Sequence, residues 1–184
     1  MANLIVISGD LAAGKSTLAA SLSAELNLVH LTKDSLKEIA CDAIGYNTRE
    51  ENRQLSIAAT DSMIYFFNQS ALVGQSLILE ANFRQDEMMK IKEIADEYHY
   101  QVLLIVLTGD INLLYQRFLD RMVNRHIAHR SLNLDYSIER FASYINDIRN
   151  QDLIYPAYTI DMTDLDEDEV TEKALSIIHQ ELGI

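Results

Sequence analysis

The sequence predicts an α/β fold in three layers, with helices on both faces of a mostly parallel sheet of about five strands. The first reason is that short apolar runs alternate with longer segments of helical spacing along the whole chain. The second is the run VLLIVL at 102–107, which contains no polar residue. A strand of that kind is covered on both faces, as it is between two helix layers of a parallel sheet.

Each element has its own sequence signal. Apolar runs rich in β-branched residues, the first of which stops at Ser8-Gly9, predict strands at 4–7, 28–31, 76–80, 102–107 and, more weakly, 158–161. Apolar residues spaced three and four apart predict helices at 15–26, from Asp34 or Ser35 to Gly45, from a Thr48-x-x-Glu51 capping box to about 74, and at 85–98, 111–125, 138–150 and 166–182. No shift in composition marks a boundary, so we expect residues 1–184 to form one domain.

Composition and charge exclude several classes of protein. The chain has 184 residues, 48% apolar and 23% charged, which is typical of a soluble globular protein. The single cysteine, Cys41, excludes a disulfide framework and a cysteine-based zinc site. No apolar run is long enough to span a membrane and the N-terminus lacks a secretion signal, so we expect a cytoplasmic location. The net charge of −13 argues against binding to extended nucleic acid or an anionic membrane.

A phosphate-binding loop follows the first predicted strand. Residues 9–17 match G-x-x-x-x-G-K-[ST], and the expected nucleotide-binding residues are Gly9, Asp10, Leu11, Ala12, Ala13, Gly14, Lys15, Ser16 and Thr17. In such a loop backbone N–H groups and a helix N-terminus bind phosphate, the lysine reaches the β- and γ-phosphates, and the serine hydroxyl ligates Mg²⁺. The motif leaves an apolar strand and opens a helix, so the sequence predicts a P-loop NTPase fold that binds ATP and Mg²⁺.

Acidic residues follow two other strands, at the sheet edge where ligands bind in open α/β sheets. Asp34 comes after the second strand. Either Asp34 caps the following helix, or Ser35 and Glu38 form a capping box and leave Asp34 free to face the cleft. Glu80 ends the third strand, where it is a candidate metal-associated carboxylate or a plain strand-end acid.

A basic segment follows the fourth strand. Four of the nine arginines fall within residues 117–130, and Arg117, Arg121 and Arg125 have the i, i+4, i+8 spacing of one helix face. They could be a solvated helix face, but in an acidic protein with a phosphate loop we interpret them as a catalytic lid at about 110–135. His126 and His129 lack an evident third metal ligand, so we expect them to bond within the lid or to contact phosphate.

These motifs together resemble the small P-loop kinases that include polynucleotide 5′-kinase, chloramphenicol phosphotransferase and the zeta toxins. The resemblance extends from Leu4 to about Ile160 and implies that Asp34 is the general base and that Lys37, three positions later, contacts the substrate. The run Leu79–Phe83 is similar to the acid-x-Asn motif of these kinases, with Glu80 where Asp is common, and we expect Asn82 and Arg84 near the substrate. The arginines and the Arg-His-x-x-His run at 125–129 resemble the lid, with Ala128 where Gly is familiar.

The sequence therefore predicts an ATP-dependent kinase that phosphorylates a hydroxyl group of a small molecule. Lys15, Asp34, Arg121 and Arg125 are the expected catalytic residues, Ser16 and Glu80 the expected metal ligands, and Arg117 a further nucleotide contact. The alternatives are a regulatory NTPase, a mechanical ATPase of the AAA type, and a polynucleotide 5′-kinase. No guanine-reading Asn/Thr-Lys-x-Asp motif is present, and Glu80 is followed by Ala81 rather than forming an Asp-Glu pair. Residues 41–73 are expected to shape the acceptor pocket.

Overall fold

The computed structural model describes residues 1–129 and 137–184. Its sheet consists of β1 (Asn3–Gly9), β2 (Val29–Thr32), β3 (Leu77–Glu80), β4 (Gln101–Thr108) and β5 (Ala157–Asp161). All neighbouring strands are parallel and the order is β2-β3-β1-β4-β5, which places β1 in the centre. The predicted α/β class and the predicted five strands are confirmed.

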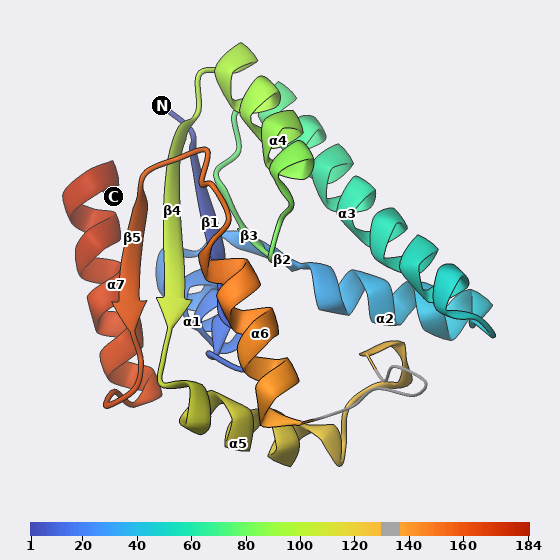
Figure 1. Cartoon of the computed structure of the whole chain (residues 1–184). Coiled ribbons are helices and arrows are strands. Elements are labelled where there is room, and N and C mark those ends of the chain that lie inside the picture. Colours follow the sequence, from blue (N-terminus) through green and yellow to red (C-terminus); the bar gives the residue numbers. More distant parts are fainter. Residues whose placement is uncertain (130–136) are drawn as a thin grey trace.

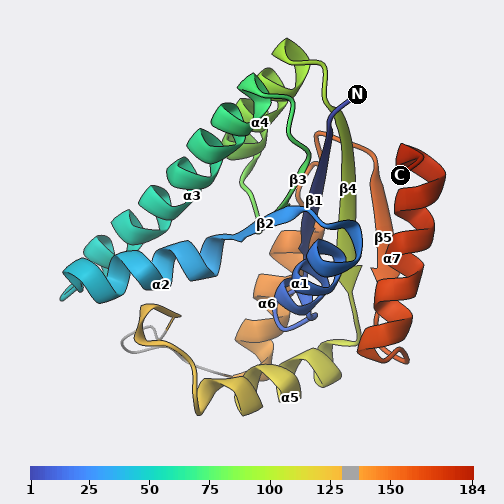
Figure 2. The same ribbon diagram turned by 180° about the vertical axis from the view of Figure 1, so that it is seen from behind.

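Helices cover both faces of this sheet. They are α1 (Lys15–Leu26), α2 (Lys33–Ile44), α3 (Arg49–Leu72), α4 (Gln85–Glu97), α5 (Ile111–Met122), α6 (Ile138–Arg149) and α7 (Glu167–Leu182), with the short 3₁₀ helix η1 (Ile127–His129) after α5. Figures 1 and 2 show α1 and α7 together, α3 and α4 as a separate pair, and α5 beyond the carboxyl ends of the strands. No helix among the described residues is long and apolar enough to cross a membrane.

The central position of β1 in the sheet explains why this strand is apolar on both faces. Successive side chains of a strand point to opposite faces. Ile5 and Ile7 pack in a cluster with residues of α1 and α7, whereas Leu4 and Val6 pack with residues of α3 and α4. Both faces of β1 are therefore buried, and its carboxyl end is held at a fixed position beneath the loop that follows.

Two local predictions are wrong. Helix α2 is capped by Thr32, whose hydroxyl accepts a hydrogen bond from the Ser35 amide at 3.3 Å, so neither Asp34 nor a Ser35–Glu38 capping box caps it. Helix α5 ends at Met122, so Arg125 lies on the loop after the helix rather than on the helical face of Arg117 and Arg121. Residues 130–136, which include Arg130 and the end of the predicted lid, lie outside the described residues.

Candidate active site

The phosphate loop is shaped by backbone angles that few residues adopt. Gly9 has a φ of +124°, and a Cβ atom at this position would lie 2.1 Å from the carbonyl oxygen of Leu107 on β4. Ala12 and Gly14 also have positive φ, of 64° and 86°. Such left-handed residues turn N–H groups inward and form an anion-binding nest, which here opens onto the N-terminus of α1.

Asp10 anchors the loop to the rest of the fold. Its side chain is fully buried, accepts hydrogen bonds from the Arg149 guanidinium at 2.5 Å and 3.1 Å, and accepts another from the Gly109 amide. The Asp10 amide donates to the Leu107 carbonyl. The carboxylate and the amide of Asp10 thus both have partners inside the protein, which gives this residue an anchoring role. Arg149 lies 139 positions away, and nothing in the sequence pattern signals this pairing.

Lys15, Ser16 and Glu80 lie together at the mouth of the loop. The Lys15 ammonium group donates to the carbonyl oxygens of Gly9 and Asp10, and the Ser16 hydroxyl donates to Glu80 Oε2 at 3.0 Å. Desolvation lowers the pKa of Lys15, against the opposing effect of Glu80. Burial raises the pKa of Glu80, while Lys15 and the Ser16 hydrogen bond oppose that shift. A serine hydroxyl and a carboxylate oxygen side by side are the oxygen donors that Mg²⁺ prefers.

Asp34 lies across a cavity from this group. The cavity has a volume of about 210 Å³, and its lining includes Lys15, Asp34, Glu80, Arg121 and Arg125. The Asp34 carboxylate is about half exposed and lies 3.7 Å from Arg125 Nη2. Since Thr32 caps α2, Asp34 is not needed for the helix end and is available for a ligand. The structure thus brings all four expected catalytic side chains to one cavity.

Arg117 lies in a different place from the two later arginines of the predicted stripe. Its Nη1 atom donates to Met162 Sδ, and it lines a second cavity of about 590 Å³ on the outer side of the loop. The other walls of that cavity include Gly14, Thr17 and Val170. Arg121 borders both cavities, so it alone of the three reaches from one to the other.

The expected substrate contacts have other partners in this structure. Lys37, the expected substrate contact, is buried, and its ammonium group donates to Asn52 Oδ1 on α3 at 2.8 Å. Burial lowers the pKa of Lys37. The Asn82 amide oxygen accepts hydrogen bonds from the Gly9 amide and the Ser8 hydroxyl, both at 3.1 Å, and so holds the start of the loop. Arg84 lies at the start of α4.

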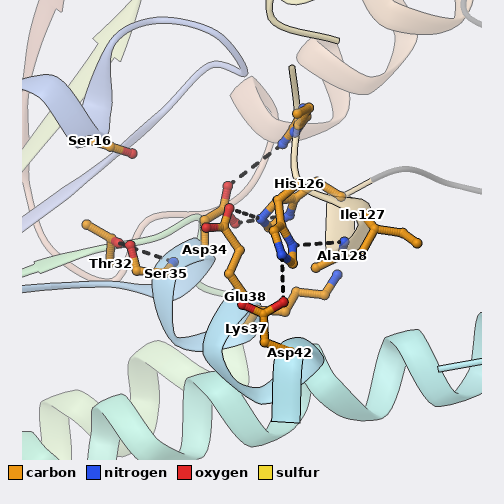
Figure 3. A network of polar contacts seen from close by, with 12 residues as sticks. Ser16, Thr32, Asp34, Ser35, Lys37, Glu38, Asp42, His126, Ile127 and Ala128 are labelled. Carbon is orange, nitrogen blue, oxygen red and sulfur yellow. Dashed lines mark hydrogen bonds and ion pairs between the residues drawn. The ribbon is translucent and has the colours of Figure 1, made fainter. Parts of the chain in front are cut away.

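The lid segment is attached to α2 and α3. Figure 3 shows Asp34, Glu38 and Asp42 of α2 on the side of the helix that faces residues 126–128. His126 Nε2 lies 3.0 Å from Asp42 Oδ1, and His129 Nε2 lies 2.9 Å from Glu38 Oε1. The Asn52 amide donates to the Ala128 carbonyl, and Ala128 itself is buried beside Cys41 and Leu55. The two histidines therefore pair with carboxylates of α2, outside the predicted lid, rather than within it. No metal-binding cluster occurs among residues 1–129 and 137–184.

The loop, the parallel sheet and the arginine-bearing segment define a P-loop kinase fold. The chain matches the zeta toxin family over residues 2–169 and belongs to that family. No curated protein matches it. A candidate kinase from Chloroflexus aurantiacus is similar at 27% identity, with a TM-score of 0.80 and coverage of 95% of this chain and 97% of that one.

More distant solved structures share the fold alone. A gluconokinase from Sinorhizobium meliloti is 14% identical, with a TM-score of 0.62 and coverage of 97% of this chain and 92% of that one. The adenosine phosphosulfate (APS) kinase of Mycobacterium tuberculosis, solved with AMPPNP and APS, is 11% identical, with a TM-score of 0.59 and coverage of 97% and 98%. These likenesses confirm the predicted kinase fold and leave the acceptor to be determined.

Proposed function

We propose that this protein is an ATP-dependent kinase that transfers the γ-phosphoryl group to a hydroxyl group of a small molecule. The observation that carries the proposal is the position of Asp34. It faces the phosphate loop across one cavity, its helix is capped by another residue, and lid arginines flank it. A nucleotide switch that only hydrolyses NTP needs no carboxylate of this kind opposite Lys15.

The chemistry assigns one task to each side chain. Asp34 takes the proton of the acceptor hydroxyl while the acceptor oxygen forms a bond to the γ-phosphorus and the bond to the β-phosphate oxygen breaks, which releases ADP. Lys15 and Arg121 stabilise the negative charge that develops on the phosphoryl oxygens. Ser16 and Glu80 are the residues that would hold Mg²⁺, which neutralises phosphate charge when it is bound.

The test is acceptor-dependent ADP release with a defined panel of acceptors. The panel contains gluconate and other sugar acids, free sugars, a nucleotide sugar, chloramphenicol, adenosine 5′-phosphosulfate and a 5′-hydroxyl oligonucleotide. We expect one class of small acceptor to stimulate ADP release and to appear as a phosphorylated product by mass spectrometry. ADP release that no hydroxyl compound stimulates would favour the regulatory NTPase instead, and stimulation by the oligonucleotide alone would favour the polynucleotide kinase.

The Asp34→Asn variant tests the mechanism. Asparagine keeps the size of the side chain but cannot take the proton, so transfer should fall by at least about a hundredfold while Mg-ATP affinity and melting temperature stay near those of the wild type. Asp42→Asn is the matched control, because Asp42 is an exposed carboxylate on the same helix that also pairs with a lid histidine. Full activity of Asp34→Asn would remove Asp34 from the mechanism.

A further inference from the structure

His129 lies between two carboxylates of α2. Its Nε2 atom is 2.9 Å from Glu38 Oε1 and its Nδ1 atom is 3.8 Å from Asp34 Oδ1. Asp34 and Glu38 are four residues apart, so they lie on the same face of the helix. The His129 side chain is only 7% exposed, whereas that of Asp34 is 55% exposed. Asp34, Glu38 and His129 all line a cavity of about 860 Å³. The largely buried imidazole therefore lies directly beside the more exposed Asp34 carboxylate.

We propose that His129 is a positioning residue for the base Asp34: Glu38 orients the imidazole ring so that Nδ1 faces Asp34 and accepts the proton that Asp34 takes from the acceptor. This inference rests on the proposed kinase function. The proposed base then consists of Asp34 assisted by His129 and Glu38, rather than of Asp34 alone. His129 has a role in the reaction in addition to attaching the lid.

The hydrogen-bond partners determine the tautomer. An ionised carboxylate only accepts hydrogen bonds, so the ring nitrogen that contacts Glu38, Nε2, must carry a proton. In a neutral ring the other nitrogen, Nδ1, then has a free lone pair, and it points toward Asp34. After transfer the proton moves from the Asp34 carboxyl to Nδ1, which leaves an imidazolium between two carboxylates. Loss of that proton to water restores the neutral ring.

Burial of the ring favours a neutral imidazole before the reaction. Desolvation lowers the pKa of His129 most strongly, Arg125 and Lys37 lower it further, and Asp34 and Glu38 raise it. The neighbouring His126 ring is 6.4 Å away between centroids. A neutral ring can accept a proton, whereas a protonated ring donates to Asp34 and weakens it as a base. Activity should therefore fall as the pH decreases through the pKa of His129.

The same segment contains a natural control. His126 makes the same kind of contact with Asp42 one helical turn further along α2, and Figure 3 shows this pair on the side of the helix next to residues 127 and 128. His126 thus attaches the lid to α2 without an ion pair to Asp34. A residue that only attaches the lid should behave like His126, and a residue that acts through Asp34 should not.

The first experiment needs no acceptor. A ¹⁵N NMR titration of the imidazole groups in the full chain should show His129 with the proton on Nε2. Asp34→Asn should lower the pKa of His129, because it removes a carboxylate that stabilises the charged ring. Asp42→Asn should leave the pKa of His129 unchanged. A proton on Nδ1, or a pKa of His129 that Asp34→Asn does not move, would overturn the proposal.

The second experiment compares His129→Gln with His126→Gln. Glutamine can still donate to Glu38 but cannot take up a proton, so His129→Gln should lower kcat by roughly tenfold, as loss of an orienting partner often does, with KM for ATP unchanged. The acid limb of its pH–rate profile should move to lower pH, and that of His126→Gln should match the wild type. Equal changes of kcat and of the pH–rate profile in the two variants would show that His129 only attaches the lid.

The two proposals fail in different ways. Full transfer by Asp34→Asn would refute the assigned base, and with it this inference. Loss of transfer in Asp34→Asn together with a wild-type pH profile in His129→Gln would refute the inference alone. If His129→Gln lowers the melting temperature too far to assay, Glu38→Ala replaces it, since the loss of the acceptor should release the Nε2–H tautomer that the NMR titration reports.

Discussion

The phosphate loop and the lid segment lie on either side of the cavity, and they are held by different kinds of contact. The loop is fixed by backbone angles, by the ion pair of the buried Asp10 carboxylate with Arg149, and by a hydrogen bond from the Gly9 amide to Asn82. The lid turn at 127–129 is fixed by Tyr46, between α2 and α3, and by Asn52 of α3, which donate to its carbonyl oxygens. Two histidine–carboxylate pairs with α2, whose acids are 39% to 72% exposed, also hold it.

This difference separates a rigid part of the site from an adjustable one. Contacts that are buried and backbone-based are insensitive to solvent, whereas exposed ion pairs contribute little stability and respond to pH and salt. The loop should therefore keep its shape with or without nucleotide. We therefore expect the lid to be the adjustable part of the site. It carries Arg121, which we assign to transfer, and Arg125, which lies beside Asp34.

The largest effect is expected on the loop side. Lys15→Ala should abolish detectable transfer and weaken Mg-ATP binding strongly, because it removes the cation that faces the phosphates. The fold should be retained, since the Lys15 ammonium group bonds only to carbonyls of its own loop among the described contacts. Calorimetric titration with Mg-ATP beside a thermal melt checks both points, with the exposed Lys90→Ala as control. Unchanged affinity would mean that the loop does not bind phosphate.

On the lid side the expected effect is smaller and is confined to turnover. Arg121→Ala should lower kcat on the order of a thousandfold and change the affinity for ATP little, as loss of an arginine finger does. Arg117→Ala should do the reverse and mainly raise KM for ATP, because Arg117 lines only the outer cavity. Steady-state kinetics of the two variants distinguish these roles. An equal decrease of kcat in both variants would show that Arg117 and Arg121 have the same role.

The anchor of the loop can be broken without touching the cavity. Arg149→Ala leaves the Asp10 carboxylate buried without its partner, which should lower the free energy of unfolding by about 3–5 kcal/mol. Arg140→Ala, on the same helix and exposed, is the control and should cost little. Chemical denaturation measures the difference. A loss below about 1 kcal/mol is no more than a single hydrogen bond contributes on balance. Such a result would show that the backbone alone holds the loop.

The smallest of these effects is expected where the lid meets α3. Asn52→Ala removes the partner of the buried Lys37 ammonium group and the donor to the Ala128 carbonyl, and it should cost about 1–3 kcal/mol. Hydrogen exchange at 126–129 should become faster while that of the phosphate loop stays the same. Ser62→Ala, an exposed position on α3, should change neither. Faster exchange in both regions would contradict the separation of loop and lid.

Local signals were enough to predict much of the molecule. Strands and helices follow from short-range apolar spacing, and residues 9–17 contain a complete backbone motif, so both could be read from neighbouring residues. The predictions failed where the local sequence allowed more than one structure. Thr32, Asp34 and Ser35 can all cap a helix, and only the position of the end of β2 selects Thr32. The regular spacing of the arginines could not show that α5 ends at Met122.

By itself the sequence determined the fold class, the phosphate loop and the chemistry available at the sheet edge, because each depends on residues that are close together in the chain. Only the tertiary structure decided which partners these residues have. Asp10 pairs with Arg149, Lys37 turns to Asn52, and His129 lies between Asp34 and Glu38. Contacts between segments 15 to 139 residues apart depend on how helices pack around the sheet, and no spacing in the sequence encodes them.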